Sequence, residues 1–316
     1  MSGKIKLGIS TCLLGEQVRY DGGHKLDRFL RDTLGQYVDY IPVCPEVECG
    51  LSIPREAMRL VGNPENPRLV TIRTKIDYTD LMQSWGVKRL KELEKEDLCG
   101  YIFKSKSPSS GLERVKVYYK NGMPVHNGIG IWARMFLSHF PYLPVEDEGR
   151  LHDPGIRENF IERIFILKRW REMIVRGKTM NNLIDFHTDH KLLIMAHSPQ
   201  LYRAMGKIVA EGKNHNIEEL FHDYREHMIK AMQLKTTTKK NVNVLQHIMG
   251  YFKKNLSADE KQELMEIIES YHHEFIPLIV PVTLLNHYVR KYGQQYLKRQ
   301  FYLNPHPLEL KLRTHV

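Results

Sequence analysis

The sequence has few cysteines and no long apolar run. Among its 316 residues only four are cysteine, so the dense disulfide framework of a small secreted domain is excluded. No run of 18 apolar residues is present, which excludes a hydrophobic transmembrane helix. Because the first residues also lack the apolar core and the cleavage site of a signal peptide, we expect a cytoplasmic protein with no membrane partner.

The four cysteines, Cys12, Cys44, Cys49 and Cys99, all lie in the first hundred residues. In a reducing compartment they are not expected to form structural disulfides, and buried thiols are their ordinary interpretation. Their concentration in one half of the chain nevertheless favours a site in that half. Cys99 directly precedes an expected strand, and we interpret it as structural.

Acidic residues are scarcer in the second half of the chain. Residues 1–150 have 22 Lys and Arg against 19 Asp and Glu, whereas residues 151–316 have 25 against 18, together with 13 of the 16 histidines. A basic half is typical of a protein that binds RNA or DNA. A solvated helical surface accounts for the same charge, because no dense arginine run occurs, and both interpretations stay open.

The first half alternates short apolar runs with amphipathic ones. Strands are predicted at 5–10, 38–43, 69–76 and 100–104, and helices at 26–34 and 78–96. Strands separated by helices predict an α/β domain with a parallel, Rossmann-like sheet over residues 1–148.

Ligands of such sheets bind beyond the carboxyl ends of the strands. The loops richest in glycine, proline and serine follow three of the expected strands directly. We therefore expect these loops to converge at one edge of the sheet. Their convergence would place Cys12, Cys44 and the loop 107–111 near one another.

The second half is predicted to be an all-α domain over residues 149–316. Asp153 and Pro154 form a helix start, and Ser257 to Glu260 form a capping box. Helices are expected at 154–176, 181–196, 199–211, 217–234, 242–255, 258 onward and 283–292, which makes a bundle of six or seven.

Three separated motifs of the first half resemble one family. They are Ser10–Gly15 with Arg19–Gly22, then Cys44–Glu46 with Gly50, Leu51, Pro54 and Arg55, and finally Lys104–Gly111. Their residues, order and spacing resemble those of the thiouracil desulfidase (TudS) family over roughly residues 4–146. The second half resembles the helical domain of YbgA-type proteins, through the segments 157–163, 186–191, 241–245 and 247–252. The whole chain thus resembles a YbgA-type two-domain protein.

The resemblance implies an activity and a cofactor. In the family, three cysteines hold a 4Fe-4S cluster whose fourth iron binds the sulfur of a thiolated pyrimidine of the 2-thiouracil type. Water then replaces that sulfur without net redox change. An open iron acts as a Lewis acid, and iron prefers sulfur ligands, so cluster and substrate suit each other. The expected substrate is a thiolated pyrimidine, free or in RNA.

The family's functional residues carry over to matching positions. Cys12 and Cys44 correspond to two cluster ligands, Glu46 to a catalytic carboxylate that moves protons, and Ser107 to a polar active-site residue. Without the resemblance, Cys12 would be interpreted as a buried thiol and Glu46 as a surface carboxylate. Ser107 would be interpreted as part of a plain turn.

The third family cysteine is replaced by Ser110 in this chain. Serine is a poorer ligand than a thiolate for soft iron. Three explanations stay open: the cluster and the activity are lost, Cys49 substitutes as a metal ligand, or the serine was introduced to remove an oxidation-prone thiol. If the site is degenerate, the alternative function is a binding or regulatory protein whose basic helical domain contacts nucleic acid.

Two weaker signals complete the set of candidate sites. The backbone of Asp21–Lys25 precedes an expected helix and is interpreted either as an anion cradle or as a plain turn. His187 and His190, three positions apart on an expected helix, are a candidate metal pair that needs a third ligand. The adjacent His272 and His273 face different directions on a helix and are not expected to act together.

Overall fold

A computed structural model describes residues 4–119, 122–212 and 215–315. The chain divides into two compact units, Met1–Asp153 and Pro154–Val316, each with its own core. The predicted boundary between residues 148 and 149 stays a prediction. Within the described part of the chain, no helix has the length and apolar character needed to cross a membrane.

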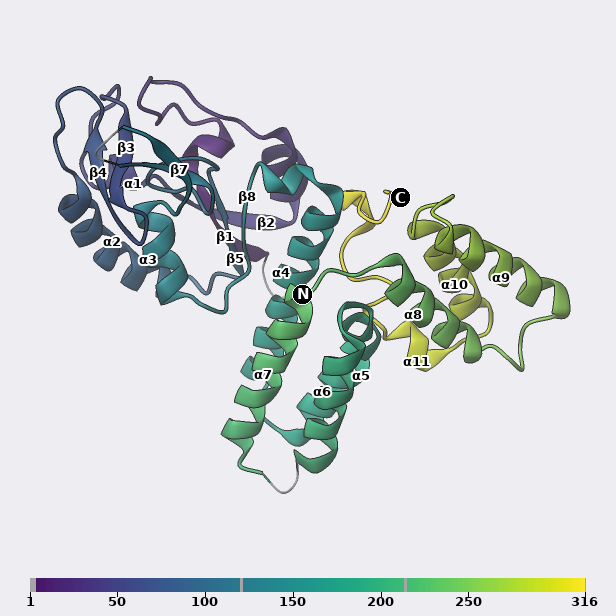
Figure 1. Cartoon of the computed structure of the whole chain (residues 1–316). Coiled ribbons are helices and arrows are strands. Elements are labelled where there is room, and N and C mark those ends of the chain that lie inside the picture. Colours follow the sequence, from purple (N-terminus) through teal and green to yellow (C-terminus); the bar gives the residue numbers. More distant parts are fainter. Residues whose placement is uncertain (1–3, 120–121, 213–214, 316) are drawn as a thin grey trace. The chain divides into compact units, whose positions relative to one another are not determined.

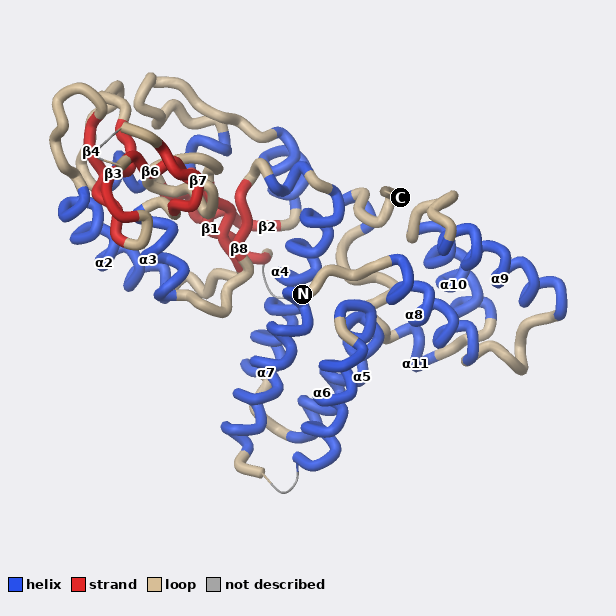
Figure 2. Tube along the Cα trace, in the orientation of Figure 1, coloured by secondary structure: helices blue, strands red, loops and turns tan. Residues whose placement is uncertain are grey.

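The first unit is built on a four-stranded parallel sheet. Its strands lie in the order β2-β1-β5-β8, and their bounds are β1 Ile5–Ser10, β2 Val38–Val43, β5 Gly100–Phe103 and β8 Val145–Asp147 (Figures 1 and 2). The side chains of the central strand β5 are all buried, as expected for a parallel sheet covered on both faces. The predicted α/β class with a parallel sheet is therefore confirmed.

A second sheet was not predicted. Its strands lie in the order β4-β3-β6-β7, and their bounds are β3 Met58–Asn63, β4 Asn66–Thr71, β6 Val115–Tyr118 and β7 Pro124–Gly128. The expectation that residues 69–76 form a strand of the parallel sheet is wrong, because Leu69 lies in β4 and pairs antiparallel with Leu60 of β3. A tight hairpin between Asn63 and Asn66 sets this direction, and β-branched composition carries no information about strand direction.

The helices of the first unit differ in length. Helix α2 (Thr79–Glu94) packs against α3 (Ile131–His139), and α1 is a short helix over Pro45–Glu48. The helix expected at 26–34 is largely replaced by a five-residue π-helical turn, Phe29–Thr33, and a 3-10 turn, Leu34–Gln36. Under α3 lies a buried aromatic cluster in which the Trp132 indole donates to the Tyr101 hydroxyl at 3.2 Å.

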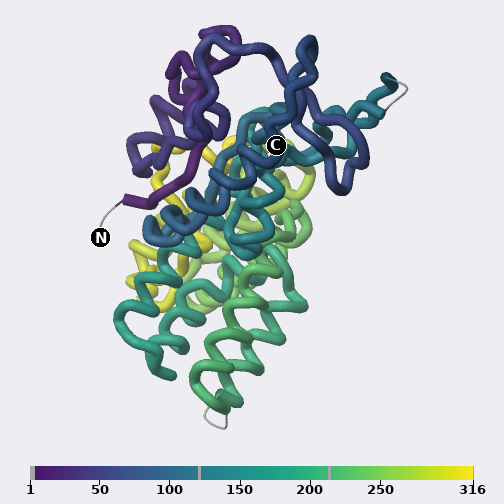
Figure 3. The backbone as a smooth tube through the Cα atoms, turned by 90° about the vertical axis from the view of Figure 1, so that its left-hand side faces the viewer, coloured from purple at the N-terminus to yellow at the C-terminus, as the bar shows by residue number. Residues whose placement is uncertain are grey.

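The second unit is all helical, as predicted. Its helices are α4 Pro154–Val175, α5 Met180–His197, α6 Pro199–Glu211, α7 Ile217–Gln233, α8 Thr238–Gly250, α9 Ala258–His272, α10 Ile279–Lys291 and α11 Gln295–Lys298. The helices α5, α6 and α7 pack side by side, and α8, α9 and α10 form a second group (Figures 1 and 3). The predicted capping box from Ser257 to Glu260 is confirmed at the start of α9.

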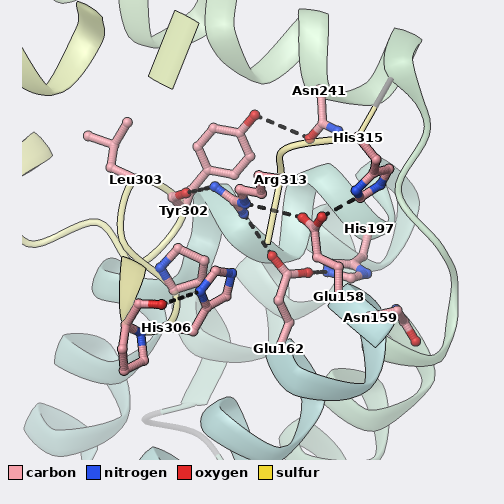
Figure 4. A network of polar contacts seen from close by, with 12 residues as sticks. Glu158, Asn159, Glu162, His197, Asn241, Tyr302, Leu303, His306, Arg313 and His315 are labelled. Carbon is pink, nitrogen blue, oxygen red and sulfur yellow. Dashed lines mark hydrogen bonds and ion pairs between the residues drawn. The ribbon is translucent and has the colours of Figure 1, made fainter. Parts of the chain in front are cut away.

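A buried ionic network joins distant segments of the second unit (Figure 4). The Arg313 guanidinium donates to Glu158 at 3.2 Å, to Glu162 at 2.7 Å and to the Tyr302 carbonyl at 2.6 Å. His197 lies between the Glu162 carboxylate, at 2.9 Å, and the Leu234 carbonyl, at 2.6 Å. The network therefore fixes helix α4 to the end of α5, to the segment after α7 and to the last residues of the unit.

The two carboxylates of this network differ in their surroundings. Burial, followed by the negative charge of Glu162, raises the pKa of Glu158 above its usual range. Burial also acts on Glu162, but the hydrogen bond from His197 and the charge of Arg313 outweigh it and lower the pKa of that carboxyl. Glu162 is thus the better compensated partner of Arg313, and Glu158 holds its proton more tightly in the folded protein than in the unfolded chain.

We predict a stability change with pH that depends on Glu158. Because its folded pKa lies above the unfolded value, the stability that Glu158 contributes is present at low pH and is lost as pH rises through the folded pKa. Urea unfolding of the full chain measures the free energy of unfolding. As pH rises from about 5 to about 8, this free energy should increase in Glu158→Gln relative to wild type by on the order of 1–3 kcal/mol. The exposed Glu274→Gln is the matched control, and a difference between Glu158→Gln and wild type that is independent of pH would contradict the prediction.

Candidate functional site

A pocket of about 430 Å³ lies beyond the carboxyl ends of β1, β2 and β5. The predicted convergence of the three loops is confirmed, because each of them contributes to its walls. From the candidate set the lining includes Cys12, Cys44, Glu46, Ser107 and Ser110. Arg19, Lys25, Arg55 and Lys104 also line it and give the pocket an excess of positive charge.

Local backbone structure positions the two thiols. Cys12 lies in a 3-10 turn (Thr11–Leu14) that ends at Gly15, whose φ of 100° is a left-handed conformation that glycine adopts readily. The Cys12 carbonyl accepts from Lys25 N at 2.9 Å, which closes the loop. Cys44 is the residue before helix α1, and its N–H donates to the Glu48 carboxylate at 2.8 Å. Each thiol therefore directly follows a strand and sits on an anchored turn.

The serine loop is held by hydrogen bonds of its own. The hydroxyls of Ser107 and Ser109 lie 2.9 Å apart, and Ser110 N donates to the Ser107 hydroxyl at 3.2 Å. Helix α3 fixes the loop from outside, since Gly130 N donates to the Gly111 carbonyl at 2.8 Å. A Cβ at Gly130 would lie 2.3 Å from the Ser109 carbonyl oxygen, so only glycine permits this approach.

The Glu46 carboxylate has three polar neighbours. The Ser109 hydroxyl donates to it, the Arg55 guanidinium lies 3.9 Å away and the Cys44 sulfur 3.6 Å away. Arg55 is itself fixed by donating to the Val18 carbonyl at 3.1 Å, and its side chain is only 9% exposed. Ser109 and Arg55 were not predicted as site residues, although both lie inside the motifs that carry the family resemblance.

A second, partly buried ion pair borders the pocket. The Lys104 ammonium pairs with Glu148 and bonds to the Ser105 carbonyl at 3.0 Å, while Ser105 N donates to Glu148 at 2.6 Å. The backbone N–H of Lys104 donates to the Ser10 hydroxyl at 2.9 Å, which links β5 to β1 at the pocket edge. Glu148 was not predicted, because the sequence gives no sign that the end of β8 approaches the serine loop.

Burial dominates the chemistry of the pocket thiols. It raises the pKa of Cys12 to about 11 and that of Cys44 to about 12, and the negative charge of Glu46 adds to both shifts. The Lys104 charge acts in the opposite direction on Cys12, and the Arg55 charge does so on Cys44. Without a metal both groups are therefore thiols at neutral pH, and a metal ion has to displace their protons.

Cys49, proposed as a substitute ligand, faces another environment. Its S–H donates to the Glu46 carbonyl at 3.2 Å, and its side chain packs in an apolar cluster with Leu60, Leu69 and Met82. It does not belong to the pocket lining. Cys99 is buried at the start of β5, with its N–H donating to the Lys6 carbonyl at 2.8 Å.

The weaker candidate sites are placed as follows. The N–H groups of Gly22 and Gly23 bond within their own loop, to the Arg19 carbonyl at 3.0 Å and to the Asp21 carboxylate at 3.1 Å, so the proposed anion cradle is wrong. One ring nitrogen of each histidine of the candidate metal pair is engaged: His187 Nδ1 lies 3.0 Å from the Tyr224 hydroxyl, and His190 Nδ1 lies 2.7 Å from the Phe186 carbonyl. Among the described residues, no third His, Cys, Asp or Glu side chain gathers with them.

Family comparisons agree with this architecture. Residues 7–148 match the family model described as 2-thiouracil desulfurase, and residues 191–307 match a family described as protein of unknown function, DUF1722. The first unit therefore defines a domain related to thiouracil desulfidases. Over 152 residues the chain is 31% identical to the uncharacterized protein YbgA of Escherichia coli K12. The aligned segment covers 48% of this chain and 90% of YbgA. The chain therefore belongs to the family of YbgA. It joins a 2-thiouracil desulfurase domain to a DUF1722 domain, as predicted.

The chain is also similar to a second protein over a shorter segment, and to one solved structure with a low TM-score. The chain is 28% identical over 108 residues to the uncharacterized protein YbbK of Bacillus subtilis 168, which covers 33% of this chain and 71% of that protein. A solved structure of the 4Fe-4S-dependent thiouracil desulfidase TudS is 28% identical, with a TM-score of 0.38, and covers 48% of this chain and 95% of that one.

The donor set of the pocket determines whether such a cluster fits this chain. Two thiols, Cys12 and Cys44, and one hydroxyl, Ser110, line the same cavity. Among the described residues, no three His, Cys, Asp or Glu side chains gather to hold a metal ion. The two thiols suit iron, and the position of the third family cysteine is occupied by a hydroxyl in this chain.

We predict that the pocket thiols react slowly in the metal-free protein. Because their pKa values are raised, alkylation of Cys12 and Cys44 by iodoacetamide at pH 8 should be on the order of 100-fold slower than that of free cysteine. The rate should still rise steeply up to pH 9.5, as measured per residue by mass spectrometry. The same protein in urea is the control, and equal rates in native and unfolded protein would contradict the expected shifts.

Proposed function

We propose that the first unit removes sulfur from a thiolated pyrimidine by non-redox hydrolysis at a 4Fe-4S cluster. One observation supports this proposal above the others: a single pocket beyond the parallel sheet gathers Cys12, Cys44, Glu46 and Ser107. The same residues lie within the segment that matches the 2-thiouracil desulfurase family. The substrate class and the cofactor are taken from that family.

Cys12 and Cys44 would hold two irons of the cluster. When bound, the cluster supplies an open, thiophilic Lewis acid for the sulfur of the substrate. The protein around it contributes charge. Lys104 places a partly buried cation near Cys12, which favours the thiolate that metal binding needs. The pair with Glu148 keeps Lys104 in this position.

Glu46 is the proton carrier in this proposal. Its carboxylate accepts a hydrogen bond from Ser109 and lies beside the Arg55 guanidinium, so its orientation is fixed from two sides. A water molecule that attacks the carbon bearing the sulfur must lose its proton, and a carboxylate within hydrogen-bond reach takes it. Ser107, linked to the same network through Ser109, provides a hydroxyl for the polar edge of the pyrimidine.

The experiment that tests this function measures sulfide release. Full-length protein, reconstituted anaerobically with iron and sulfide, should release sulfide from 2-thiouracil or 4-thiouracil. The substitution Glu46→Gln should reduce the rate on the order of 100-fold or more while leaving the iron content unchanged, because general acid–base catalysis supplies a factor of that size.

Glu16→Gln is the matched control, since Glu16 is exposed and lies outside the pocket lining. It should keep the wild-type rate. Absence of sulfide release from loaded wild-type protein with both thiouracils would refute the proposed function, and an unchanged rate in Glu46→Gln would refute the role given to Glu46.

The alternative function, nucleic-acid binding by the helical unit, stays a prediction. A groove of about 1160 Å³ in this unit contains Lys178, Lys207 and Arg225, but also Glu211, Glu218, Glu219 and Asp223. Its charges are mixed, whereas phosphate binding favours a uniformly basic surface. No geometric feature of this groove favours the alternative over the desulfidase proposal.

A further inference from the structure

The replacement of the third family cysteine has a specific structural consequence. We propose that Ser110 is itself a ligand of the cluster, through its side-chain oxygen, so that two thiolates and one oxygen hold the irons. This inference rests on the cluster of the proposed function and names the ligand that the proposal left open. Three observations support it: the position of Ser110, the partners of its hydroxyl and the environment of Cys49.

Ser110 is fixed at the pocket wall. It is only 3% exposed and lines the same cavity as Cys12 and Cys44. Its N–H is bound by the Ser107 hydroxyl, and its neighbour Gly111 is held by Ser107 on one side and by Gly130 on the other. The loop therefore presents the Ser110 side chain from a defined backbone, as a ligand position requires.

The Ser110 hydroxyl hydrogen-bonds to no other residue in the described part of the chain. The hydroxyl lies at the pocket wall and is not one of the fully buried unpartnered polar atoms, so it is open to an occupant of the pocket. The Cys12 thiol is in the same situation, and Cys44 has only long contacts, at 3.6 and 3.9 Å. Ser110 and Cys12 therefore each offer the pocket a donor that no other described residue uses, and Cys44 offers one that is held only by long contacts.

Cys49 shows the opposite pattern. Its S–H is used by the Glu46 carbonyl, and its side chain belongs to the apolar cluster beneath the second sheet. To reach the pocket it would have to give up both the hydrogen bond and its packing. The carbonyl it bonds belongs to Glu46, so the same movement would disturb the proposed proton carrier. The structure therefore favours Ser110 over Cys49 as the third ligand.

The ligation step is balanced without a redox partner. The O–H bond of Ser110 breaks, an O–Fe bond forms and the proton leaves to solvent, as it does when a thiol binds iron. An alkoxide is a harder donor than a thiolate and matches iron less well. The oxygen-held iron should consequently be the most easily removed of those that the protein binds.

The test compares four full-length proteins after anaerobic reconstitution: wild type, Ser110→Ala, Ser110→Cys and Cys49→Ala. Iron and sulfide are counted per chain, loss of iron to a chelator is timed, and Mössbauer spectra are recorded with ⁵⁷Fe. Circular dichroism of the metal-free proteins checks that each variant folds.

Ser110→Ala should lose iron on the order of tenfold faster than wild type or fail to retain a cluster, and Ser110→Cys should retain it on the order of tenfold longer. Cys49→Ala should behave as wild type. The Mössbauer spectra of wild type and Ser110→Cys should differ at one iron subsite, which a merely structural role of Ser110 would not produce.

Several results would overturn the inference. If Cys49→Ala loses the cluster and Ser110→Ala keeps it, Cys49 is the ligand. If only Ser110→Cys holds a cluster, or if all four proteins or none hold it equally, Ser110 is not a ligand. Iron retention that depends on Ser110 without sulfide release would refute the desulfidase function alone, and sulfide release that is unaffected by Ser110→Ala would refute the ligand alone.

Discussion

The parallel pairing of β1 with β2 and β5 is the constraint on which the candidate site depends. Because the three strands run in one direction, their carboxyl ends meet at one edge, and the loops that follow them carry both pocket thiols and the serine run. An antiparallel arrangement would place at least one loop at the opposite edge. The hydrogen bond from Lys104 N to the Ser10 hydroxyl extends this pairing past the last strand residue and draws the serine loop toward Cys12.

The sequence was sufficient where the signal is local or periodic. A few neighbouring residues are enough to predict the buried strand β5, the helix start at Pro154 and the capping box at Ser257, and the structure contains all of them. The second sheet was missed because β6 and β7 are short and partly exposed, and because pairing between distant strands leaves no local pattern. In the same way, Glu148 joins the pocket only through the position of β8 beside β5.

The two units handle buried charge differently. At the pocket, cations exceed carboxylates, and two thiols and the Ser110 hydroxyl lie in the lining of the same cavity. In the helical unit, Arg313 satisfies two carboxylates at once and leaves one of them poorly compensated. Replacing buried ion networks by apolar side chains often costs little stability, whereas removing one partner costs several kcal/mol. Arg313 is thus a position where single substitution should be poorly tolerated, although the network as a whole need not be the main source of stability.

The division of the chain after Asp153 also bears on how such proteins arise. Each unit closes its own core, and one relative with 90% of its length aligned corresponds to only 48% of this chain. A segment of that size can therefore exist as a protein by itself. Joining two units in one polypeptide keeps them at equal abundance. A single polypeptide therefore couples the two units in expression, without requiring either fold to change.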